Sequence, residues 1–279
     1  MNNIFVGIEW DLHLENELFK NSDKFDIVEV VPENFFYAEK IQLKHSIDQI
    51  KEMKKPIICH GVELSIGSRE PLKEKHLEDM MRLFDAFGPI NYSDHLCMTE
   101  AQGIEIGQLT PLRWSRDLAD FISEKIIKVQ NKIGMPFLIE NITNTFVCPI
   151  NEITETEFIN RVLKNTNCGM LLDVTNVFTN SYNHKFDPIR WIDEIDLSKV
   201  AQIHLAGGFY DEDRVLQDTH SEAVFDESWE LYEYVIKKIG PVPTIIERTG
   251  NIPKINCLIE EAEKARSIQN AAKKFKEIT

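Results

Sequence analysis

The chain has 279 residues, 43% of them hydrophobic, with 46 acidic against 31 basic residues and a formal net charge of −15. This charge argues against nucleic acids and anionic membrane surfaces as partners, because both bind clustered lysine and arginine. No apolar run approaches the roughly 20 residues of a membrane-spanning helix, and residues 1–7 lack the basic and apolar regions of a signal peptide, so we expect a cytoplasmic protein.

Short apolar or β-branched runs recur along the chain and predict eight β-strands. In order, they cover residues 5–10, 27–32, 57–62, 90–96, 137–142, 170–175, 200–205 and 244–248. Successive runs start 22 to 47 residues apart, which leaves room for a helix between each pair, as parallel strands require.

Helical patterns fill most of the gaps. Between residues 112 and 133 the apolar positions follow a 3.6-residue period, and we expect Thr110-Pro111 to open this helix and Gly134 to end it. Residues 154–157, Thr-Glu-Thr-Glu, form a capping-box pattern at the start of another helix. Further helices are expected near residues 39–54, 72–87, 186–195, 222–239 and 255–276, and the pattern is weakest at 13–21.

Eight strands alternating with helices predict an α/β fold, a (β/α)8 TIM barrel that spans residues 1–279 as a single domain. No linker-like composition or fixed-period repeat marks a domain boundary. A doubly wound open sheet is the alternative fold. No G-x-G-x-x-G follows the first strand, which weakens a dinucleotide-binding version of that alternative.

Potential metal ligands stand at the ends of six consecutive predicted strands. Side chains at the C-terminal ends of barrel strands converge on one face, and these positions hold His60, His95, Glu140, Asp173, His204 and Glu247. Asn176 lies three residues after Asp173, and Asp218 and His220 follow the seventh strand. We expect residues 216–220 to be extended, which would place Asp218 and His220 on one face.

The group, more than any single member, indicates a metal centre. A lone histidine is more often structural than a ligand, and we expect that role for His13, His45, His76 and His184. Burying many ionisable groups together is costly unless they pair or bind cations. Nine candidate ligands exceed what one tetrahedral ion uses. The five cysteines are scattered without a C-x-x-C pair, so nitrogen and oxygen ligands would select iron, manganese or zinc.

These candidate ligands lie in segments that resemble a known family. The segments are His60-Gly-Val-Glu-Leu-Ser-Ile-Gly-Ser68, Ser93-Asp-His-Leu96, Leu138-Ile-Glu-Asn141, Leu171-Leu-Asp-Val-Thr-Asn-Val177, Ile203-His-Leu-Ala-Gly207, Asp218-Thr-His220 and Ile246-Glu-Arg248. In their order and combination they resemble the multinuclear non-haem iron-dependent oxidases, which include the oxidase that forms the oxazolone of methanobactin. Asp94, Gly208 and Thr249 depart from the residues common in that family.

The resemblance implies a (β/α)8 barrel that holds two or three iron ions in mixed Fe(II)/Fe(III) states. The ligands carried over are His60, His95, Glu140, Asp173, Asn176, His204, Asp218, His220 and Glu247, with Asp218 and His220 also as candidate catalytic residues. It implies O2 as co-substrate and a cysteine-containing, ribosomally made precursor peptide as substrate, in the biosynthesis of a modified peptide natural product (RiPP). A small partner protein often presents the peptide in this family.

Two other functions stay open. Sugar isomerases and phosphodiesterases use similar metal-dependent barrels, and a non-catalytic, metal-stabilised peptide-binding partner would need only a closed site. Among further residues, Glu33-Asn34 could contact substrate but fit a structural loop better, and Arg248 could hold Glu247 or a substrate carboxylate. Residues 65–68 form a loop near the predicted mouth, and residues 209–215 are expected to vary with substrate.

Overall fold

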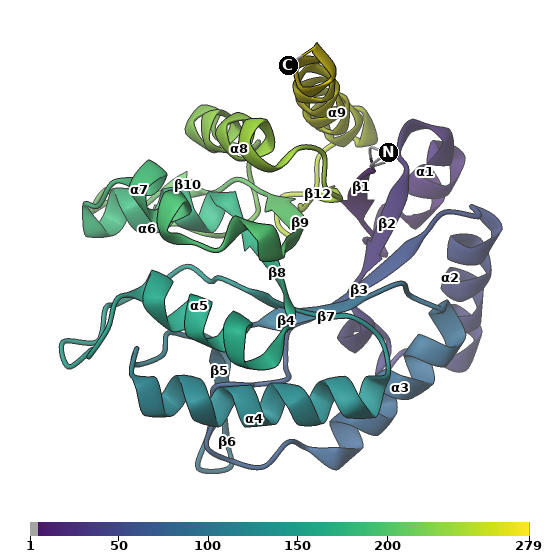
Figure 1. Cartoon of the computed structure of the whole chain (residues 1–279). Helices are drawn as coiled ribbons and strands as arrows, with labels where there is room; N and C mark the ends of the chain where they lie inside the picture. Colours follow the sequence, from purple (N-terminus) through teal and green to yellow (C-terminus); the bar gives the residue numbers. More distant parts are fainter. Residues whose placement is uncertain (1–4, 279) are drawn as a thin grey trace.

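Eight parallel strands close into a barrel in the computed structural model, which describes residues 5–278, with side chains to residue 275 (Figure 1). The strands are β1 Val6–Glu9, β2 Ile27–Val30, β3 Ile57–Gly61, β4 Tyr92–His95, β7 Phe137–Glu140, β8 Gly169–Asp173, β9 Val200–Leu205 and β12 Thr244–Ile246. Each predicted strand is present, and the (β/α)8 barrel is confirmed. Most of their residues are buried, as expected for strands with helices on one face and a packed barrel interior on the other.

Helices surround the barrel and carry the chain back between strands (Figure 1). The α-helices are α1 Glu15–Lys20, α2 Lys40–Glu52, α3 Glu74–Phe87, α4 Arg116–Ile133, α5 Glu155–Thr166, α6 Val174–His184, α7 Pro188–Glu194, α8 Asp226–Ile239 and α9 Ile255–Ile278, with short 3₁₀ helices η1 Ser22–Lys24, η2 Pro32–Phe35 and η3 Leu197–Lys199. None of these described helices is long and apolar enough to cross a membrane.

The helix ends test the predicted caps. The capping box at α5 is present, with Thr154 accepting from the Glu157 backbone N–H and Glu157 accepting in return. Gly134 ends α4 in the left-handed conformation, with φ of 66°. The predicted start of α4 at Thr110-Pro111 was wrong, because Thr110 belongs to a strand and Ser115 caps the helix.

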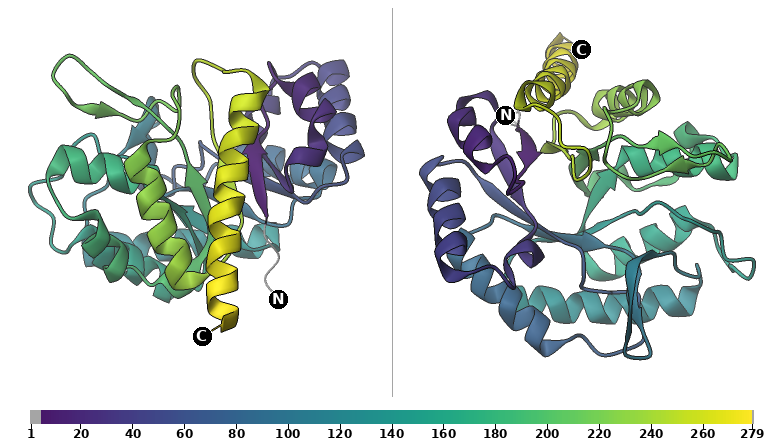
Figure 2. Two further views of the ribbon diagram at one scale, coloured as in Figure 1. Left: turned by 90° about the horizontal axis from the view of Figure 1, so that it is seen from above. Right: turned by 180° about the vertical axis from the view of Figure 1, so that it is seen from behind.

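Two hairpins beyond the barrel strands were not predicted. One joins β5 Met98–Ala101 to β6 Ile104–Thr110, and the other joins β10 Phe209–Tyr210 to β11 Leu216–Gln217. In Figure 2, left, the second hairpin extends from the end of the barrel where α9 begins. Strand β11 stops at Gln217 and His220 has a φ of 50°, so the prediction of an extended segment over 216–220 was wrong.

Candidate metal centre

The strand ends bring five of the predicted ligands together inside the barrel mouth. His60, His95, Glu140, Asp173 and His204 each lie within the last two residues of their strands and are at most 8% exposed. The strand register pairs His95 with Glu140 and Asp173 with His204 across neighbouring strands. Parallel strands in register place such residues at one level of the barrel, which explains why positions far apart in sequence meet.

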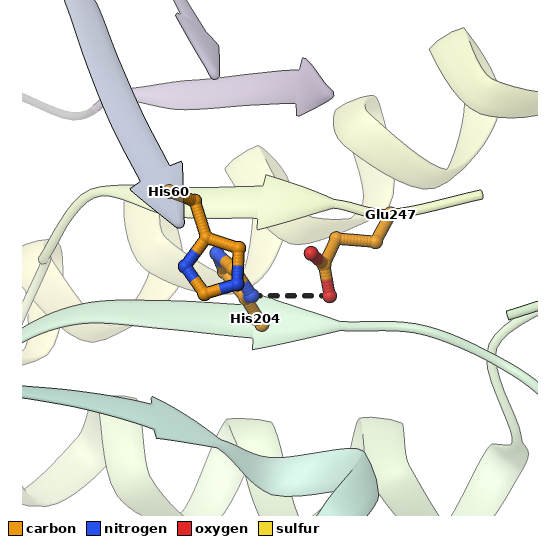
Figure 3. A group of neighbouring side chains, drawn as sticks. All are labelled: His60, His204 and Glu247. Carbon is orange, nitrogen blue, oxygen red and sulfur yellow. Dashed lines mark ion pairs between the residues drawn. The ribbon is translucent and has the colours of Figure 1, made fainter. Parts of the chain in front are cut away.

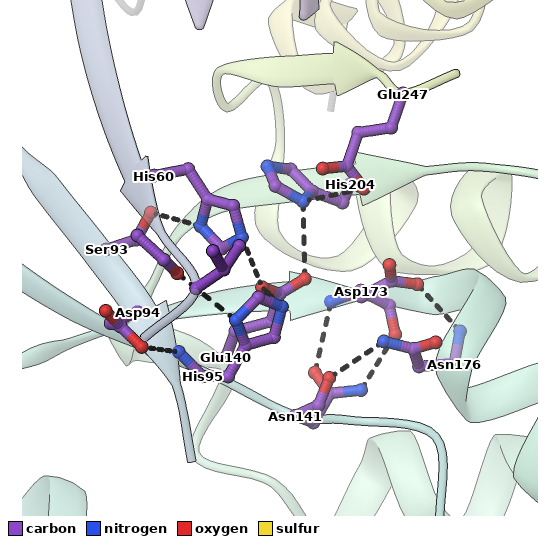
Figure 4. A network of polar contacts seen from close by, with 12 residues as sticks. His60, Ser93, Asp94, His95, Glu140, Asn141, Asp173, Asn176, His204 and Glu247 are labelled. Carbon is purple, nitrogen blue, oxygen red and sulfur yellow. Dashed lines mark hydrogen bonds and ion pairs between the residues drawn. The ribbon is translucent and has the colours of Figure 1, made fainter. Parts of the chain in front are cut away.

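Glu140 is the centre of these contacts. Its Oε2 lies 3.2 Å from Nε2 of both His60 and His95, and its Oε1 lies 3.2 Å from Nδ1 of His204 (Figure 4). Glu247, one residue after β12, places Oε2 3.0 Å from the same His204 nitrogen (Figure 3). Two carboxylates therefore share three imidazole rings in a buried space.

The outer hydrogen bond of His95 fixes which of its nitrogens faces the carboxylate. Its Nδ1 lies 3.2 Å from the carbonyl oxygen of Gly61, which only accepts, so Nδ1 carries the proton. The Nε2 of a neutral ring then directs a lone pair at Glu140. A backbone carbonyl in this role is typical of histidines that bind a metal through the other nitrogen.

The other two rings follow the same logic. His60 places Nδ1 2.9 Å from the hydroxyl of Ser93, whose own proton is directed to the carbonyl of Cys59 at 3.4 Å. His204 places Nε2 2.9 Å from Oε2 of the fully buried Glu29. In a neutral ring the inner nitrogen presents a lone pair to a carboxylate, a contact that repels unless a cation lies between. Burial alone would lower the pKa of His204, but Glu247, Glu29 and Glu140 hold it well above its usual value, so without metal a proton takes the place of that cation.

The contacts also fail as hydrogen bonds. Within the described residues, Glu140 Oε2, Asp173 Oδ2, His204 Nδ1 and Glu247 Oε2 are buried without a hydrogen-bond partner. Ligand atoms bound about 2.1 Å from one ion, at right angles, are about 3 Å apart, which is the spacing seen here. Atoms that lie this close without aligning on each other fit a shared cation.

Within the part of the chain that the structure describes, three overlapping groups of side chains could each hold an ion. They are His60–His204–Glu247, His60–His95–Glu140 and Glu140–Asp173–His204–Glu247, and within each the ligand atoms lie within 4.8 Å of one another. His60, Glu140, His204 and Glu247 each belong to two of these groups. Shared carboxylates such as Glu140 and Glu247 suit a centre of more than one ion, since a carboxylate can bridge two ions.

Asp218 and His220 form the outer wall of the site. His220 Nε2 lies 3.0 Å from Asp218 Oδ1, and His220 Nδ1 lies 3.7 Å from Glu247 Oε2. The preceding glycines allow this return, because a Cβ on Gly207 would lie 2.1 Å from the Ala223 carbonyl oxygen. Close backbone approach, and not a positive φ, therefore requires glycine at this position.

Asn176 occupies the first turn of α6, beside Asp173. The Asp173 side chain caps this helix by accepting from the Asn176 backbone N–H at 2.7 Å. The Asn176 side chain accepts from the Thr143 hydroxyl at 2.6 Å and donates to the Asn141 carbonyl at 3.0 Å. Its carbonyl oxygen keeps one lone pair, so a role as ligand stays a prediction.

Two buried glutamates of the site were missed from the sequence. Glu9 ends β1 and has no hydrogen-bond partner for Oε2, and Glu29 in β2 holds His204. The signal was present, because each is the single acid in a run of apolar residues, at 6–9 and 27–30.

Burial and neighbouring charges shift the pKa values of the ionisable side chains in the site. Burial lowers the pKa of His60 to about 3 despite Glu140 nearby, so its ring is neutral and able to bind metal. Burial alone would raise the pKa of Glu247, but His204 and His220 hold it well below its usual range. Burial and the neighbouring acids raise the pKa of Asp173 well above normal, which marks an excess of negative charge in the site.

Of the remaining candidates, Asn34 lines the cavity in front of the cluster, and Glu33 and Arg248 have structural contacts. Glu33 accepts from the backbone N–H groups of Val62 and Glu63 at 3.1 and 3.4 Å. Arg248 donates to Glu261 at 3.0 Å, an ion pair outside the cluster.

A cavity of about 520 Å³ opens onto the centre. Part of its wall is formed by ligand candidates, namely His60, His95, Asp218, His220 and Glu247. The opposite part comes from outside the barrel strands and includes Lys73, His76 and residues 107–109 of β6. A substrate in this cavity would therefore contact both the ligand cluster and the first hairpin.

Comparison with known sequences gives one family. The pattern of the family described as "RiPP precursor modification enzyme MbnB/TglH/ChrH" matches residues 5–270. A UPF0276 protein of Rhizorhabdus wittichii is 37% identical over 88% of this chain and 87% of its own length. Another, from Acinetobacter baylyi, is 33% identical over 95% of this chain and 91% of its own length.

Comparison with solved structures gives the same barrel. A 3-keto-D-glucoside 4-epimerase from E. coli superposes with a TM-score of 0.60 at 12% identity, over 95% of this chain and all of that one. A D-psicose 3-epimerase from Clostridium cellulolyticum superposes with a TM-score of 0.55 at 14% identity, over 99% of each chain. Identities this low show a shared fold alone.

Proposed function

The chain belongs to the RiPP precursor modification enzyme MbnB/TglH/ChrH family, and we propose that it is an iron-dependent oxidase of cysteine residues in a ribosomally made precursor peptide. O2 is the proposed co-substrate and electron acceptor, and the peptide cysteine is the electron donor. A small partner protein that presents the peptide is part of the proposal.

The observation that carries this proposal is the set of three buried imidazole rings around Glu140. The outer nitrogens of His60, His95 and His204 face a hydroxyl, a carbonyl and a carboxylate, and their inner nitrogens meet carboxylate oxygens at 3.0–3.2 Å. Cations resolve this arrangement, and nitrogen and oxygen ligands without thiolate suit iron.

The residues proposed to hold two or three iron ions are His60, His95, Glu140, Asp173, Asn176, His204, Asp218, His220 and Glu247. Bound iron would supply one-electron redox chemistry and an affinity for sulfur and O2. The protein residues orient the rings through Ser93, Gly61 and Glu29 and balance the ionic charge with carboxylates. Asp218 and His220 are 17% and 20% exposed, so they can contact a substrate.

The test is anaerobic purification followed by metal analysis and an oxygen-electrode assay. We expect more than one iron per chain, and O2 consumption that depends on a cysteine-containing peptide encoded beside the gene. His220→Ala should lose iron and oxidation while its circular dichroism spectrum is unchanged. One zinc per chain, with no O2 uptake after iron loading, would contradict the proposal.

The same measurements separate the alternatives. A sugar isomerase or phosphodiesterase on this barrel would turn over its substrate without consuming O2. A peptide-binding partner with a structural metal would leave no open coordination position, so nitric oxide would fail to bind the ferrous protein in an EPR experiment.

A further inference from the structure

The β5–β6 hairpin has one covered edge. The hydroxyl of Ser65 accepts from the backbone N–H groups of Thr99 and Glu100 at 2.9 and 3.1 Å. The backbone N–H of Gly67 donates to the carbonyl of Cys97 at 2.8 Å. The loop that follows β3 therefore occupies the side of β5 that faces away from β6.

The opposite edge of the hairpin, along β6, is open. Among described residues, β6 makes no backbone hydrogen bond to a strand or loop other than β5. Residues 104–108 are exposed, and the side chain of Ile104 is 69% exposed. An open edge of this kind presents N–H and C=O groups that pair with another extended backbone.

This edge leads into the cavity of the ligand cluster. Glu105, Gly107, Gln108 and Leu109 line it, whereas Ile104 and Ile106 do not. Gly107 has a φ of 74°, so the strand is irregular within the stretch that lines the cavity. Seven residues of strand span roughly 23 Å, so a peptide paired along β6 would lie partly in solvent and partly beside the cavity.

We propose that an extended segment of the peptide substrate adds to β6 as a third strand, with its cysteine carried into the cavity. This inference rests on the proposed function for the identity of the occupant. Main-chain pairing would tolerate many sequences, and the cavity would select the cysteine.

Charge favours a peptide with basic residues beside its cysteine. Away from the ligand candidates, the cavity is lined by three glutamates, Glu63, Glu100 and Glu105, and by one lysine, Lys73. Lys73 already forms ion pairs with Glu100 and Glu105. A second copy of the chain is a poorer occupant of the edge, because pairing through β6 would bring two Glu105 carboxylates together.

The test uses the metal-loaded full chain and pools of synthetic ten-residue peptides. Each peptide has a central cysteine flanked by lysines, randomised outer positions and a photoreactive benzoylphenylalanine at one end. After illumination under argon, mass spectrometry should place the crosslinks within residues 104–109. Glutamates in place of the lysines should lower the yield severalfold, and Glu105→Lys should reduce that difference without changing the metal content.

Backbone N-methylation supplies the control. With the cysteine anchored at the centre, methyl groups on one alternating set of amides should lower crosslinking about tenfold, because each removes a pairing hydrogen bond. Methyl groups on the other set should be tolerated.

The outcomes separate the two proposals. If both methylated sets lowered crosslinking equally while the remaining crosslinks stayed at β6, the peptide would pair with β6 in more than one register. The cysteine would then not be anchored at the centre, and this result would count against the proposed function. Crosslinks elsewhere, no crosslinks, equal yields with and without methylation, or a dimer joined through β6 in light scattering would overturn the pairing.

Discussion

Glu140 joins the two sides of the candidate centre. One of its oxygens meets His60 and His95, and the other meets His204. Burial alone would raise the pKa of Glu140, but His95 and His60 hold it below its usual value, so the side chain is an anion when it meets a metal. Its charge, more than its shape, is what the centre requires.

Glu140→Gln keeps the shape and removes the charge. We expect the variant to retain its fold and to lose roughly half or more of its bound metal, because a neutral amide is a much weaker ligand and bridge. Inductively coupled plasma mass spectrometry measures the metal per chain. The control is Glu155→Gln, a glutamate that bonds Asn144 and Trp191 away from the cluster. Equal metal in both variants would remove Glu140 from the centre.

Glu33 makes stability depend on pH. Burial, with Asp94 nearby, raises the pKa of Glu33 to about 8. A carboxyl whose pKa is higher in the folded than in the unfolded state contributes stability at low pH that is lost as the pH rises through the folded value. Glu33→Gln removes this loss and keeps an acceptor for Val62.

Between pH 5 and pH 9, the free energy of unfolding of the metal-free protein should therefore fall more than that of Glu33→Gln, by on the order of 3 kcal/mol. Urea denaturation at both pH values gives the comparison. Parallel curves for the two proteins would show that Glu33 is ionised throughout this range.

At the scale of elements, buried strands could be predicted and exposed hairpins could not. The barrel strands are continuous apolar runs, which packing on both faces dictates. Strand β6 alternates only over Ile104-Glu105-Ile106 before Gly107 interrupts the pattern, and residues 104–108 are exposed, so its strand signal is short. Helix α6 was not predicted. It begins at Val174, directly after its cap Asp173, whereas the apolar run predicts that the strand continues to residue 175.

Gly207→Ala tests how the segment after β9 is held. The new Cβ would lie 2.1 Å from one carbonyl oxygen and 2.3 Å from another, both in backbone. We expect unfolding to become easier by roughly 1–3 kcal/mol and Asp218 and His220 to shift, with loss of metal.

Gly88→Ala is the matched control, since its Cβ would meet open space and only its φ of 69° is unfavourable. That variant should lose about 1 kcal/mol and no metal. Thermal unfolding and metal analysis of both variants decide the outcome, and full metal content in Gly207→Ala would contradict the expectation.

At the scale of the whole molecule, the clustering of the candidate ligands could be predicted because the barrel fold could be predicted. Once eight parallel strands are accepted, their C-terminal ends must meet, and the polar residues there become one group. Glu9 and Glu29 were missed because a lone acid in an apolar run also fits an ion pair or a helix cap. The ring orientations could not be predicted, since they depend on Ser93, Gly61 and Glu29 in three dimensions.

Metal removal should expose the excess negative charge of the site. Burial and neighbouring acids raise the pKa values of Asp173 and Glu9, so the metal-free protein should lose stability as the pH rises from 6.5 to 8. Bound metal reverses this trend, because ligands bind it in their deprotonated forms.

At a metal concentration a hundred times its Kd, the gain in the free energy of unfolding is about 2.7 kcal/mol. Thermal unfolding of the metal-loaded and the chelator-treated protein at both pH values measures it. A metal effect that does not grow with pH would argue against carboxylate ligation.

Strand β1 pairs with β12, so closing the barrel joins the start of the chain to its end. The group His60–His204–Glu247 draws on both halves, and its last member follows β12. A nascent chain on the ribosome therefore lacks the two groups that contain Glu247 until that residue has emerged. The candidate centre is then complete only at the end of translation, and a truncated product would keep at most the group His60–His95–Glu140.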